Sequence, residues 1–459
     1  MKGHSNLSYS HYVPPLFNGG DIYICRIVPF SESIHFEWKD DLENAEYEIF
    51  FRKRGTESFA SAGKTAECEF DIQKLCDGTD YEFYVQSGNK KSRIRLARTG
   101  EPIGTVVNYL HPEDGAYSFS GSYLCSPSLV RHPEGYLLAS MDVYDLGAPQ
   151  NLALIFRSDD DGKTWHHVSD LMPCFWPKLF IHRGDLYVLA CSCEYGDLLI
   201  SRSCDGGKTF CAPVALLRGS GGKKGNCGVH KNPQNVFYHG GRIYETLEWG
   251  TWENKEYGHA AMVMSCSEDD DLLVPENWSF TEPVKFDHFA PEISHLKKPV
   301  MTIEGTLTLS PCGKLLNIMR FGMRDHVLAY EVNTEHHEAP LKYHGIIKMG
   351  VTFAKFMIKF DDVSGKYYSV ASKTHDGCPD YARNYLVLLC SPDLENWTVE
   401  RELFDFRHID AEKVGLQYID FSFDGDDIIY LCRTAINDAA SFHDSNYSTF
   451  HRICNFRGE

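Results

Sequence analysis

The chain has 459 residues, of which 43% are hydrophobic and 24% charged, an ordinary globular balance rather than a disordered one. At about 150 residues per domain, this length predicts roughly three domains or one large repeat array. The 45 Lys and Arg residues against 64 Asp and Glu residues leave a formal net charge of −19. Because such a chain repels phosphate backbones and anionic lipid surfaces, nucleic acid and membranes are excluded as expected partners.

The amino-terminal stretch MKGHSNLSYSHYVPPL has one Lys and no apolar run, so no secretory signal is expected. No stretch approaches the roughly 18 uninterrupted apolar residues of a membrane-spanning helix. The 16 cysteines occur without the CxxC or paired Cys/His spacing of a zinc site. We therefore expect a cytoplasmic protein with free thiols, no metal and no other cofactor.

Residues 21–99 have the pattern of short strands separated by turn signals. Ile34, Phe36 and Trp38, for example, alternate onto one face of a predicted strand. Such a segment offers no chemistry of its own, and we expect it to pack against or space a catalytic partner. The stretch Arg98-Thr99-Gly100-Glu101-Pro102 is the expected boundary between this segment and the rest of the chain.

The end of this segment carries a second signal. Leu75, followed by Gly78 and by Tyr81 at the start of a strand, resembles the tyrosine corner of sandwich domains. Together with Trp38 on an early strand, this pattern makes residues 1–100 resemble a fibronectin type III-like β-sandwich. Residues 101–459 form the second predicted domain.

From residue 120 onwards, a strand-rich unit with a Gly turn recurs about every 40–60 residues. Six copies align on the turns HPEGYLLAS (132–140), HRGDLYVLA (182–190), HGGRIYETL (239–247), SPCGKLLNI (310–318), VSGKYYSVA (363–371) and DGDDIIYLC (424–432). Six strand-rich copies without helical periodicity predict an all-β chain whose larger part is a six-bladed β-propeller. An irregular seventh blade has room in residues 279–300 or 335–352. We expect residues 104–111 to pair with the last strand and close the ring, since closure removes exposed sheet edges.

Residues 158–165 and 203–210 both fit the motif S-x-D-x-G-x-T-W/F. The Ser and Asp side chains can close a tight turn, the Gly permits a positive φ, and the aromatic ring fills the gap between blades. The motif resembles the Asp box of sialidase-like propellers, with degenerate copies at 275–280 and 391–398. Because the Asp box is structural and lies away from the active site in that superfamily, its carboxylates are not catalytic candidates.

Several loops of the predicted propeller carry residue types that suit a sugar site. In this topology the loops leading into the innermost strands, and those joining the second and third strands, meet over the central channel. These loops are long and rich in His, Trp, Tyr, Arg and carboxylates, which match the faces and hydroxyl edges of a sugar. The catalytic candidates are His230, Glu304, Asp142 and Asp420. The substrate-binding candidates are Arg320, Arg433, Arg383, Tyr418, Trp176, Trp249 and His443.

Each candidate has a structural alternative. His230 is the preferred proton-transfer group because His transfers protons near neutral pH, although a packed or solvated His is common. Glu304 could act as an acid or base, or cap neighbouring amides. Strand alternation places Tyr418 and Asp420 on one face, which we expect to point toward the site. The tryptophans are either stacking platforms or blade packing, and His443 either orients substrate or belongs to a turn.

The three arginines follow strands that end on the same predicted face of the propeller. One exposed Arg carries little information, whereas three converging guanidinium groups would form an anion clamp. Their convergence would let an acidic sugar bind against the negative field of the whole chain.

The propeller region resembles a bacterial group of sialidase-like proteins that includes rhamnosidases and rhamnose–glucuronate lyases. The resemblance rests on SGSYLCSPSLV (120–130), CSPDLENWTV (390–399), GLQYIDFSFDGDDIIYLCRTA (415–435) and HDSNYSTFHRICNF (443–456). It implies exo-acting removal of a terminal sugar, commonly rhamnose linked to an acidic residue. This sequence departs from these families at two positions. Leu124-Cys125-Ser126-Pro127 replaces the Arg-Ile-Pro stretch of true sialidases, which disfavours a sialic acid hydrolase, and Met141-Asp142 replaces a His-Asp pair of the rhamnosidase-like proteins.

The sequence therefore predicts a glycoside hydrolase that cleaves a terminal bond of an acidic oligosaccharide, uronate-containing and rhamnose-capped by the resemblance. Hydrolysis typically needs two carboxylates, whereas β-elimination needs a neutralised uronate and a His or Tyr base. The candidates contain ingredients for both reactions, so a lyase on the same substrates stays open as an alternative. A non-catalytic glycan-binding propeller is the other alternative. The sequence does not indicate an oligomeric state.

Overall fold

The computed structural model describes residues 9–12, 22–43, 45–220, 225–252, 258–285 and 300–458. Apart from two single-turn helices, η1 (Gly115–Tyr117) and η2 (Pro275–Asn277), the regular structure of these residues consists of β-strands. Neither helix has the length and apolar character needed to cross a bilayer, and no other helix in the described ranges does. The predicted all-β class is confirmed.

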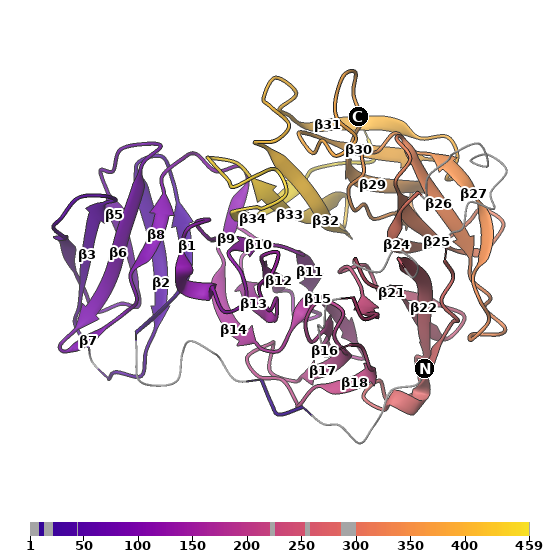
Figure 1. Ribbon diagram of the computed structural model, residues 1–459, viewed down its shortest axis with the longest axis horizontal. Coiled ribbons are helices and arrows are strands. Elements are labelled where there is room, and N and C mark those ends of the chain that lie inside the picture. Colours follow the sequence, from indigo (N-terminus) through magenta and orange to yellow (C-terminus); the bar gives the residue numbers. More distant parts are fainter. Residues whose placement is uncertain are drawn as a thin grey trace.

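Residues 22–98 form two antiparallel sheets that face one another, at the left of Figure 1. The first sheet has the order β1 (Tyr23–Pro29), β2 (Ser33–Lys39), β5 (Glu69–Gln73). The second has the order β4 (Ala60–Thr65), β3 (Tyr47–Lys53), β6 (Asp80–Ser87), β7 (Lys90–Lys91), with β8 (Arg95–Arg98) also paired to β6. Ile34, Phe36 and Trp38 are buried between the sheets, as their alternation predicts. The hydroxyl of Tyr81 accepts a hydrogen bond from the backbone N–H of Cys76 at 3.0 Å.

Six further sheets follow in a ring (Figure 1), each beginning with its innermost strand. The first contains β10 (Tyr123–Leu124), β11 (Ser128–Arg131), β12 (Leu137–Tyr144), β13 (Leu152–Ser158) and β14 (His166–Leu171). The second contains β15 (Phe175–His182), β16 (Asp185–Cys191), β17 (Leu198–Ser203) and β18 (Val214–Leu217). The third contains β19 (Gly228–His230), β20 (Phe237–His239), β21 (Arg242–Gly250), β22 (His259–Ser267) and β23 (Trp278–Phe280).

The remaining three sheets have four strands each. The fourth contains β24 (Thr302–Leu309), β25 (Leu315–Phe321), β26 (His326–Glu331) and β27 (Lys342–Lys348). The fifth contains β28 (Lys359–Asp361), β29 (Lys366–Ser372), β30 (Tyr385–Ser391) and β31 (Thr398–Asp405). The sixth contains β32 (Gly415–Asp424), β33 (Asp427–Ala435), β34 (Tyr447–Ile453) and β9 (Thr105–Tyr109).

The sixth sheet closes the ring. Strand β9, which precedes the first sheet in the chain, pairs antiparallel with β34, with Tyr109 opposite Tyr447. The predicted closure by residues 104–111 is confirmed. Of the two segments with room for another blade, 335–352 supplies β27, and residues 286–299 of the other lie outside the described residues.

Both kinds of repeated turn lie where the sequence places them. All six Gly turns connect the innermost strand of a sheet to the next strand. In the first and third sheets this innermost strand is divided into two pieces, β10 and β11 or β19 and β20, which count together as the first strand. In the turn after β13, Asp160 accepts hydrogen bonds from Ser158 and Thr164, while Ser158 Oγ accepts the N–H of Gly162. The turn after β17 repeats this pattern around Asp205. These two turns join third and fourth strands, on the face opposite to the loops that join second and third strands. Their carboxylates are engaged by hydroxyl and backbone donors of the same turn.

The two facing sheets of residues 22–98, called the sandwich from here on, cover the outer edge of β9. The guanidinium of Arg26 donates to the carbonyls of Val107 (2.8 Å) and Val106 (3.0 Å) and to the Glu37 carboxylate (2.7 Å). The sandwich core continues into Val106, Tyr109 and the sixth sheet, so the two parts share one apolar cluster. An uncovered edge strand invites pairing with other chains, and this contact removes that exposure.

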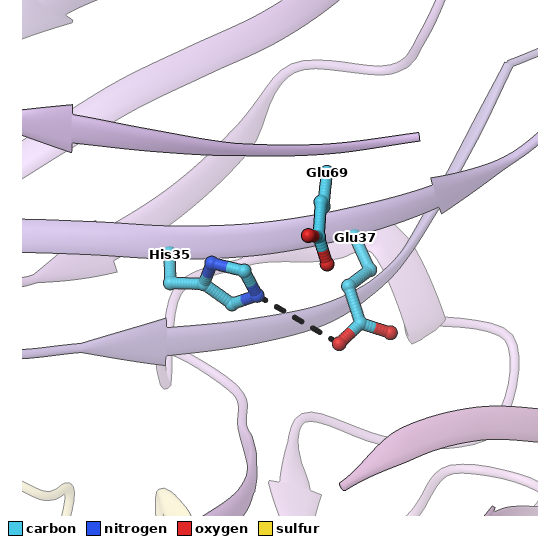
Figure 2. Close-up of side chains that lie close together, drawn as sticks. All are labelled: His35, Glu37 and Glu69. Carbon is cyan, nitrogen blue, oxygen red and sulfur yellow. Dashed lines mark ion pairs between the residues drawn. The ribbon is translucent and has the colours of Figure 1, made fainter. Parts of the chain in front are cut away.

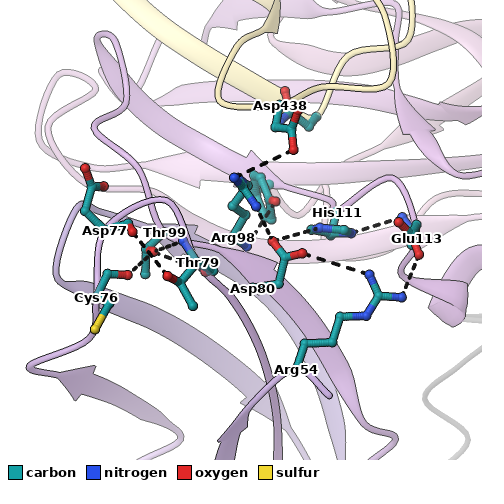
Figure 3. Close-up of polar contacts among 12 residues, drawn as sticks. Arg54, Cys76, Asp77, Thr79, Asp80, Arg98, Thr99, His111, Glu113 and Asp438 are labelled. Atoms are coloured by element: carbon teal, nitrogen blue, oxygen red, sulfur yellow. Dashed lines mark hydrogen bonds and ion pairs between the residues drawn. The ribbon is translucent and has the colours of Figure 1, made fainter. Parts of the chain in front are cut away.

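Charged groups surround the same junction (Figure 3). Asp80 pairs with Arg98 at 2.9 Å and lies 3.6 Å from His111 Nε2, while Arg54 pairs with Glu113 at 2.6 Å. These groups are partly exposed, so each contributes little stability. The Arg95–Asp114 pair differs, because both side chains are buried. Arg95 Nε lies 2.7 Å from Asp114 Oδ2, and Arg95 also donates to the Ile24 carbonyl.

Replacing Arg95 by Met should cost about 3–5 kcal/mol of unfolding free energy, because Asp114 is left as a buried, uncompensated charge. Urea unfolding measures the loss, and the exposed Arg93→Met is the matched control. Adding Asp114→Asn to Arg95→Met should restore part of the stability. A loss below about 1 kcal/mol for Arg95→Met would show that the pair does not hold the junction together.

Candidate active site

Three side chains of the site are aimed by the same backbone irregularity. Trp176 on β15, Glu304 on β24 and Tyr418 on β32 have φ values of 52°, 56° and 55°. Each lies at a register shift in the innermost strand of its sheet. A β-bulge redirects the side chain it contains, and a positive φ outside Gly is uncommon and clusters at functional sites. The bulges therefore turn these three side chains toward one region over the channel.

The residue after Glu304 has to be Gly. A Cβ at Gly305 would lie 1.9 Å from Asn317 Oδ1 and 2.7 Å from Thr246 Oγ1, which are both buried. The close approach of these side chains to the bare backbone fixes the bulge on β24. The sequence places Gly305 beside Glu304, but only the neighbouring strands reveal why.

Tyr418 and Glu304 form the central pair of the site. The phenol of Tyr418 donates to Glu304 Oε1 at 2.6 Å, and Arg320 Nη1 contacts Glu304 Oε2 at 2.6 Å. Burial, followed by the charge of Glu304, raises the pKa of Tyr418 to about 12. Burial alone would raise the pKa of Glu304, but the charges of Arg320 and His230 bring it below its ordinary value. The phenol thus keeps its proton while the carboxylate that can accept it is ionised.

Arg320, Arg383 and Arg433 surround this pair and are themselves buried. Arg320 Nη1 lies 3.3 Å from the Tyr418 hydroxyl, and the guanidinium carbons of Arg383 and Arg433 lie 5.8 Å and 4.9 Å from the centre of its ring. Burial and the like charges of Arg320 and Arg433 lower the pKa of Arg383 to about 9. Nε and Nη1 of Arg383 have no hydrogen-bond partner among the described residues. Buried donors held among like charges favour an anion, so this cluster can bind a carboxylate.

His230 reaches the central pair through a residue that the sequence did not nominate. His230 Nδ1 lies 2.7 Å from Glu248 Oε2, and Glu248 Oε1 accepts the backbone N–H of Glu304 at 2.8 Å. The ring of Trp176 packs against His230 with centroids 4.4 Å apart. Cross-strand pairing of His230 with Glu248 is the signal that could have identified this carboxylate.

His259 and Tyr195 complete this side of the site and were also missed. The His259 ring lies 4.8 Å from that of His230, and its Nε2 is 3.1 Å from the Tyr195 hydroxyl. Burial and the charge of His230 lower the pKa of His259 well below its ordinary value, so its ring is neutral. Its position as the first residue of β22, across from Gly250, places it at the site end of the third sheet.

Asp142 lies at the site end of β12, where its side chain is fully buried. Its Oδ2 accepts the backbone N–H of Trp176 at 2.8 Å, and its Oδ1 has no hydrogen-bond partner among the described residues. Burial raises the pKa of Asp142 to about 6, against the opposing influence of that hydrogen bond, of the Ser126 side chain and of Arg433. A carboxyl group with this pKa can carry a proton near neutral pH.

His443 lies beside Arg433, with its Nδ1 3.2 Å from Nη2 of that guanidinium and 2.8 Å from Asp444. The guanidinium also donates to the His443 carbonyl. Burial and the charge of Arg433 lower the pKa of His443 to about 4. A neutral His443 can therefore accept or donate a hydrogen bond to an uncharged ligand group at the edge of the arginine cluster.

Two predicted site residues are not part of this group. Alternation was expected to put Asp420 beside Tyr418, but the bulge between Gln417 and Asp420 breaks the alternation. Asp420 instead accepts hydrogen bonds from Lys178 Nζ at 2.6 Å and from the N–H of Leu129 inside the channel, which differs from the predicted arrangement beside Tyr418. Trp249 alternates with its neighbour Glu248 and, partly buried, packs against the apolar cluster between the second and third sheets, so we assign it to blade packing rather than to a stacking platform.

One group of side chains on the sandwich has the composition of a metal site. His35, Glu37 and Glu69 offer ligand atoms within 4.8 Å of one another (Figure 2). However, Oε1 of Glu37 already contacts Arg26 at 2.7 Å and lies 3.2 Å from His166 Nδ1. Because cationic side chains already compensate this carboxylate, we assign the group to ion pairing at the junction.

No family model matches the chain, and no curated protein matches its sequence. Solved structures match its fold, and the three described next have a TM-score of 0.51 each. An α-L-arabinanase of Penicillium chrysogenum, complexed with arabinobiose, is 15% identical over 78% of this chain and 99% of its own. An α-L-arabinofuranosidase of Fusarium graminearum, complexed with an iminosugar inhibitor, is 13% identical over 76% and 97%. A leech intramolecular trans-sialidase, complexed with 2,7-anhydro-Neu5Ac, is 9% identical over 99% and 98%. The chain thus has the sialidase-like propeller fold of these proteins.

The raised pKa of Asp142 makes a pH-dependent contribution to stability. Because the folded pKa exceeds the unfolded one, the stabilising contribution is complete below the unfolded value of 3.8 and is lost as pH rises through about 6. The isosteric Asp142→Asn cannot ionise, so its stability relative to the parent should rise by about 3 kcal/mol between acidic and neutral pH.

Urea unfolding of both proteins across this pH range measures the effect. The exposed Asp376→Asn is the matched control and should show no such trend. A constant stability difference between Asp142→Asn and the parent at all pH values would contradict the burial of an ionisable group at this position.

Proposed function

We propose that the protein is an exo-acting glycosidase for an oligosaccharide whose terminal sugar carries a carboxylate or is linked to a uronate. The observation that carries this proposal is the Tyr418–Glu304 hydrogen bond of 2.6 Å enclosed by three buried arginines. The arginines supply an anion site, and the pair supplies a phenol with a carboxylate base. The likeness to arabinanase, arabinofuranosidase and trans-sialidase structures supports sugar chemistry on this fold.

In the proposed reaction, the Tyr418 oxygen attacks the anomeric carbon while its proton passes to Glu304. A tyrosine nucleophile is known among sialidases. The bond between the anomeric carbon and the glycosidic oxygen breaks, and the leaving oxygen takes a proton. Water then attacks the anomeric carbon and its oxygen bonds there, while the bond to the Tyr418 oxygen breaks. The proton lost by water returns to the group that protonated the leaving oxygen, and Glu304 returns its proton to the phenol. Arg320, which contacts both members of the pair, stabilises the negative charge as it moves between them.

Two residues can protonate the leaving oxygen, and we assign this role to Asp142. Its pKa of about 6 provides an appreciable protonated fraction near neutral pH, and its Oδ1 has no hydrogen-bond partner among the described residues. His230, which the sequence analysis preferred, is anchored by Glu248 and lies against Trp176. In this proposal His230 and Trp176 form the wall that binds the sugar ring.

The finer features of the sequence-based interpretation belong to the same proposal. We infer that residues 1–100 are a fibronectin type III-like module, supported by the strand order of the two sheets and by the Tyr81 hydroxyl closing on Cys76. We infer six blades in residues 101–459, supported by the six sheets, and Asp-box turns, supported by the contacts of Asp160 and Asp205. A rhamnose cap remains one member of the substrate class to be tested.

Replacing Tyr418 by Phe should lower kcat by a factor of about 100 or more, because the nucleophilic oxygen is removed while the ring stays in place. Glu304→Gln should cause a similar loss. Because the two residues act as one unit, the double variant should be little worse than either single variant. Mass spectrometry of the products formed over time from a panel of uronate-containing and rhamnose-capped oligosaccharides measures the rates.

Tyr430→Phe on the neighbouring strand β33 is the matched control and should keep full activity. Additive losses in the Tyr418 and Glu304 variants would contradict a concerted pair. Unsaturated products that absorb ultraviolet light would show that the reaction is β-elimination, rather than hydrolysis, of a substrate bound at the same arginines. Binding of the oligosaccharide without turnover would indicate a non-catalytic glycan-binding propeller. A comparison of Asp142→Asn with His230→Gln identifies the proton donor, because the variant that lacks the donor should show the larger loss of kcat.

Arg383→Lys should raise KM for a carboxylate-bearing substrate by about tenfold or more, because Lys lacks the planar fork that binds a carboxylate bidentately. A neutral analogue with an amide in place of the carboxylate should show a much smaller change. Steady-state kinetics on both substrates, with thermal unfolding to confirm the fold, measures the difference. Equal changes for the two substrates would contradict carboxylate recognition by Arg383.

A further inference from the structure

A second group of buried charges lies deeper in the channel, outside the candidate active site. Four lysine ammonium groups gather there: Lys178, Lys231, Lys355 and Lys359. Lys178, Lys231 and Lys355 are at most 3% exposed. Three carboxylates neighbour them among the described residues: Asp420, bound to Lys178 at 2.6 Å, Glu245, which lies 3.5 Å from Lys231, and Glu304 of the candidate active site, whose charge acts on Lys355. The channel therefore contains more cationic than anionic side chains.

This group opens toward the opposite mouth of the propeller. Tyr418 and Ser422 lie four residues apart on β32, about 13 Å along an extended strand. Tyr418 faces the candidate active site, whereas Ser422 lines a separate pocket of about 970 Å³ at the other end. The pocket is also lined by Gly313 and Gly365, which belong to the turns between first and second strands. The two mouths therefore lie on opposite faces of the ring.

The pocket combines a cationic floor with apolar walls. Lys178 and Lys359 line it, and the ammonium of Lys359 contacts Ser422 Oγ at 3.2 Å. Phe180, Phe360 and Phe423 belong to the walls. Aliphatic residues such as Leu129, Leu307 and Ile358 extend these walls, and polar side chains such as Asn235 lie among them. Apolar walls leading to buried ammonium groups match a molecule with an apolar body and one anionic end.

We propose that this mouth of the channel is a binding site for a small amphiphilic carboxylate, such as a medium-chain fatty acid, distinct from the sugar site. Its carboxylate contacts the ammonium groups of Lys178 and Lys359, and its chain lies against the three phenylalanines. Charge complementarity carries the choice of ligand, since a bound anion offsets the excess of lysines over carboxylates. The proposal does not depend on the glycosidase activity.

Titration calorimetry with decanoate tests the proposal on the full chain. Lys359→Met keeps the length of the side chain and removes its charge, so decanoate should bind about tenfold or more weakly. The exposed Lys348→Met on β27 is the matched control and should bind as the parent does. Acetate, which lacks the chain, and 1-decanol, which lacks the charge, should both bind much more weakly than decanoate.

A second variant addresses the walls. Phe360 is 42% exposed, so Phe360→Ser should leave the fold intact and weaken decanoate binding by about fivefold through lost apolar contact. Unchanged affinity in both Lys359→Met and Phe360→Ser would overturn the proposal. So would equal affinities for decanoate and 1-decanol, or the absence of decanoate binding to the parent protein.

Proton uptake gives an independent readout. Burial lowers the pKa of Lys359 to about 7; Asp420 on β32 opposes this shift, and Lys178 on β15 and Lys355 before β28 add to it. A bound carboxylate supplies the missing negative charge, so binding at a pH of about 8 should draw a proton onto Lys359. Calorimetry in buffers of different ionisation enthalpy should show this uptake for the parent and not for Lys359→Met. Identical uptake in the two proteins would contradict the contact with Lys359.

Discussion

The candidate active site depends on the pairing of β9 with β34. Its residues extend from Asp142 to His443 along the chain and lie on the strands or connecting loops of all six sheets of the ring. No two neighbouring sheets contain the whole group, so the geometry exists only when the ring is closed. The pairing also gives β34 a neighbour on its outer side, and the sandwich covers the outer edge of β9. The Tyr418–Glu304 contact is thus a consequence of a pairing on the far side of the sixth sheet.

The distribution of charge explains how a chain with a net charge of −19 can favour anions. Its acidic residues are mostly exposed, where water screens them, while three arginines and three lysines are buried near the propeller axis and Lys359 is partly buried beside them. A buried charge acts over short distances in a low-dielectric region, so the local positive potential dominates for a ligand that enters the ring. The arginines lie at one mouth and the lysines extend to the other, which gives the two faces different chemistry. Net charge alone therefore indicates which macromolecules are repelled, but not which small ligands bind.

Much of the fold was predictable because its signals are local. The Gly turns, the alternation of Ile34, Phe36 and Trp38, and the closing strand at 104–111 all depend on neighbouring residues and on the general need to pair sheet edges. The candidate site was predictable in outline, because propeller topology determines which loops share a face. The sequence thus directed attention to Glu304, Tyr418 and the three arginines before their contacts were known.

The finer assignments failed where the backbone departs from regular geometry or where partners come from another sheet. Asp420 was misplaced because a bulge cannot be seen in an alternating pattern, and one inserted residue reverses every side chain after it. Glu248 was missed because its role comes from contacts with His230 and with the backbone of Glu304 in the next sheet. Tyr418 was assigned to binding because its hydrogen bond to Glu304, 114 residues away, leaves no local signal.

The cover that the sandwich places over β9 also bears on how the chain reaches its native state. The sandwich and β9 precede the other strands of the propeller, so during synthesis they can fold before the ring exists. Arg26 and the shared apolar cluster then hold β9 in place while five sheets form behind it. When β34 emerges, it meets an anchored strand rather than a free one, which lowers the conformational search required to close a loop of several hundred residues. Such an order of events would make the sandwich a template for closing the ring, a role that involves no ligand.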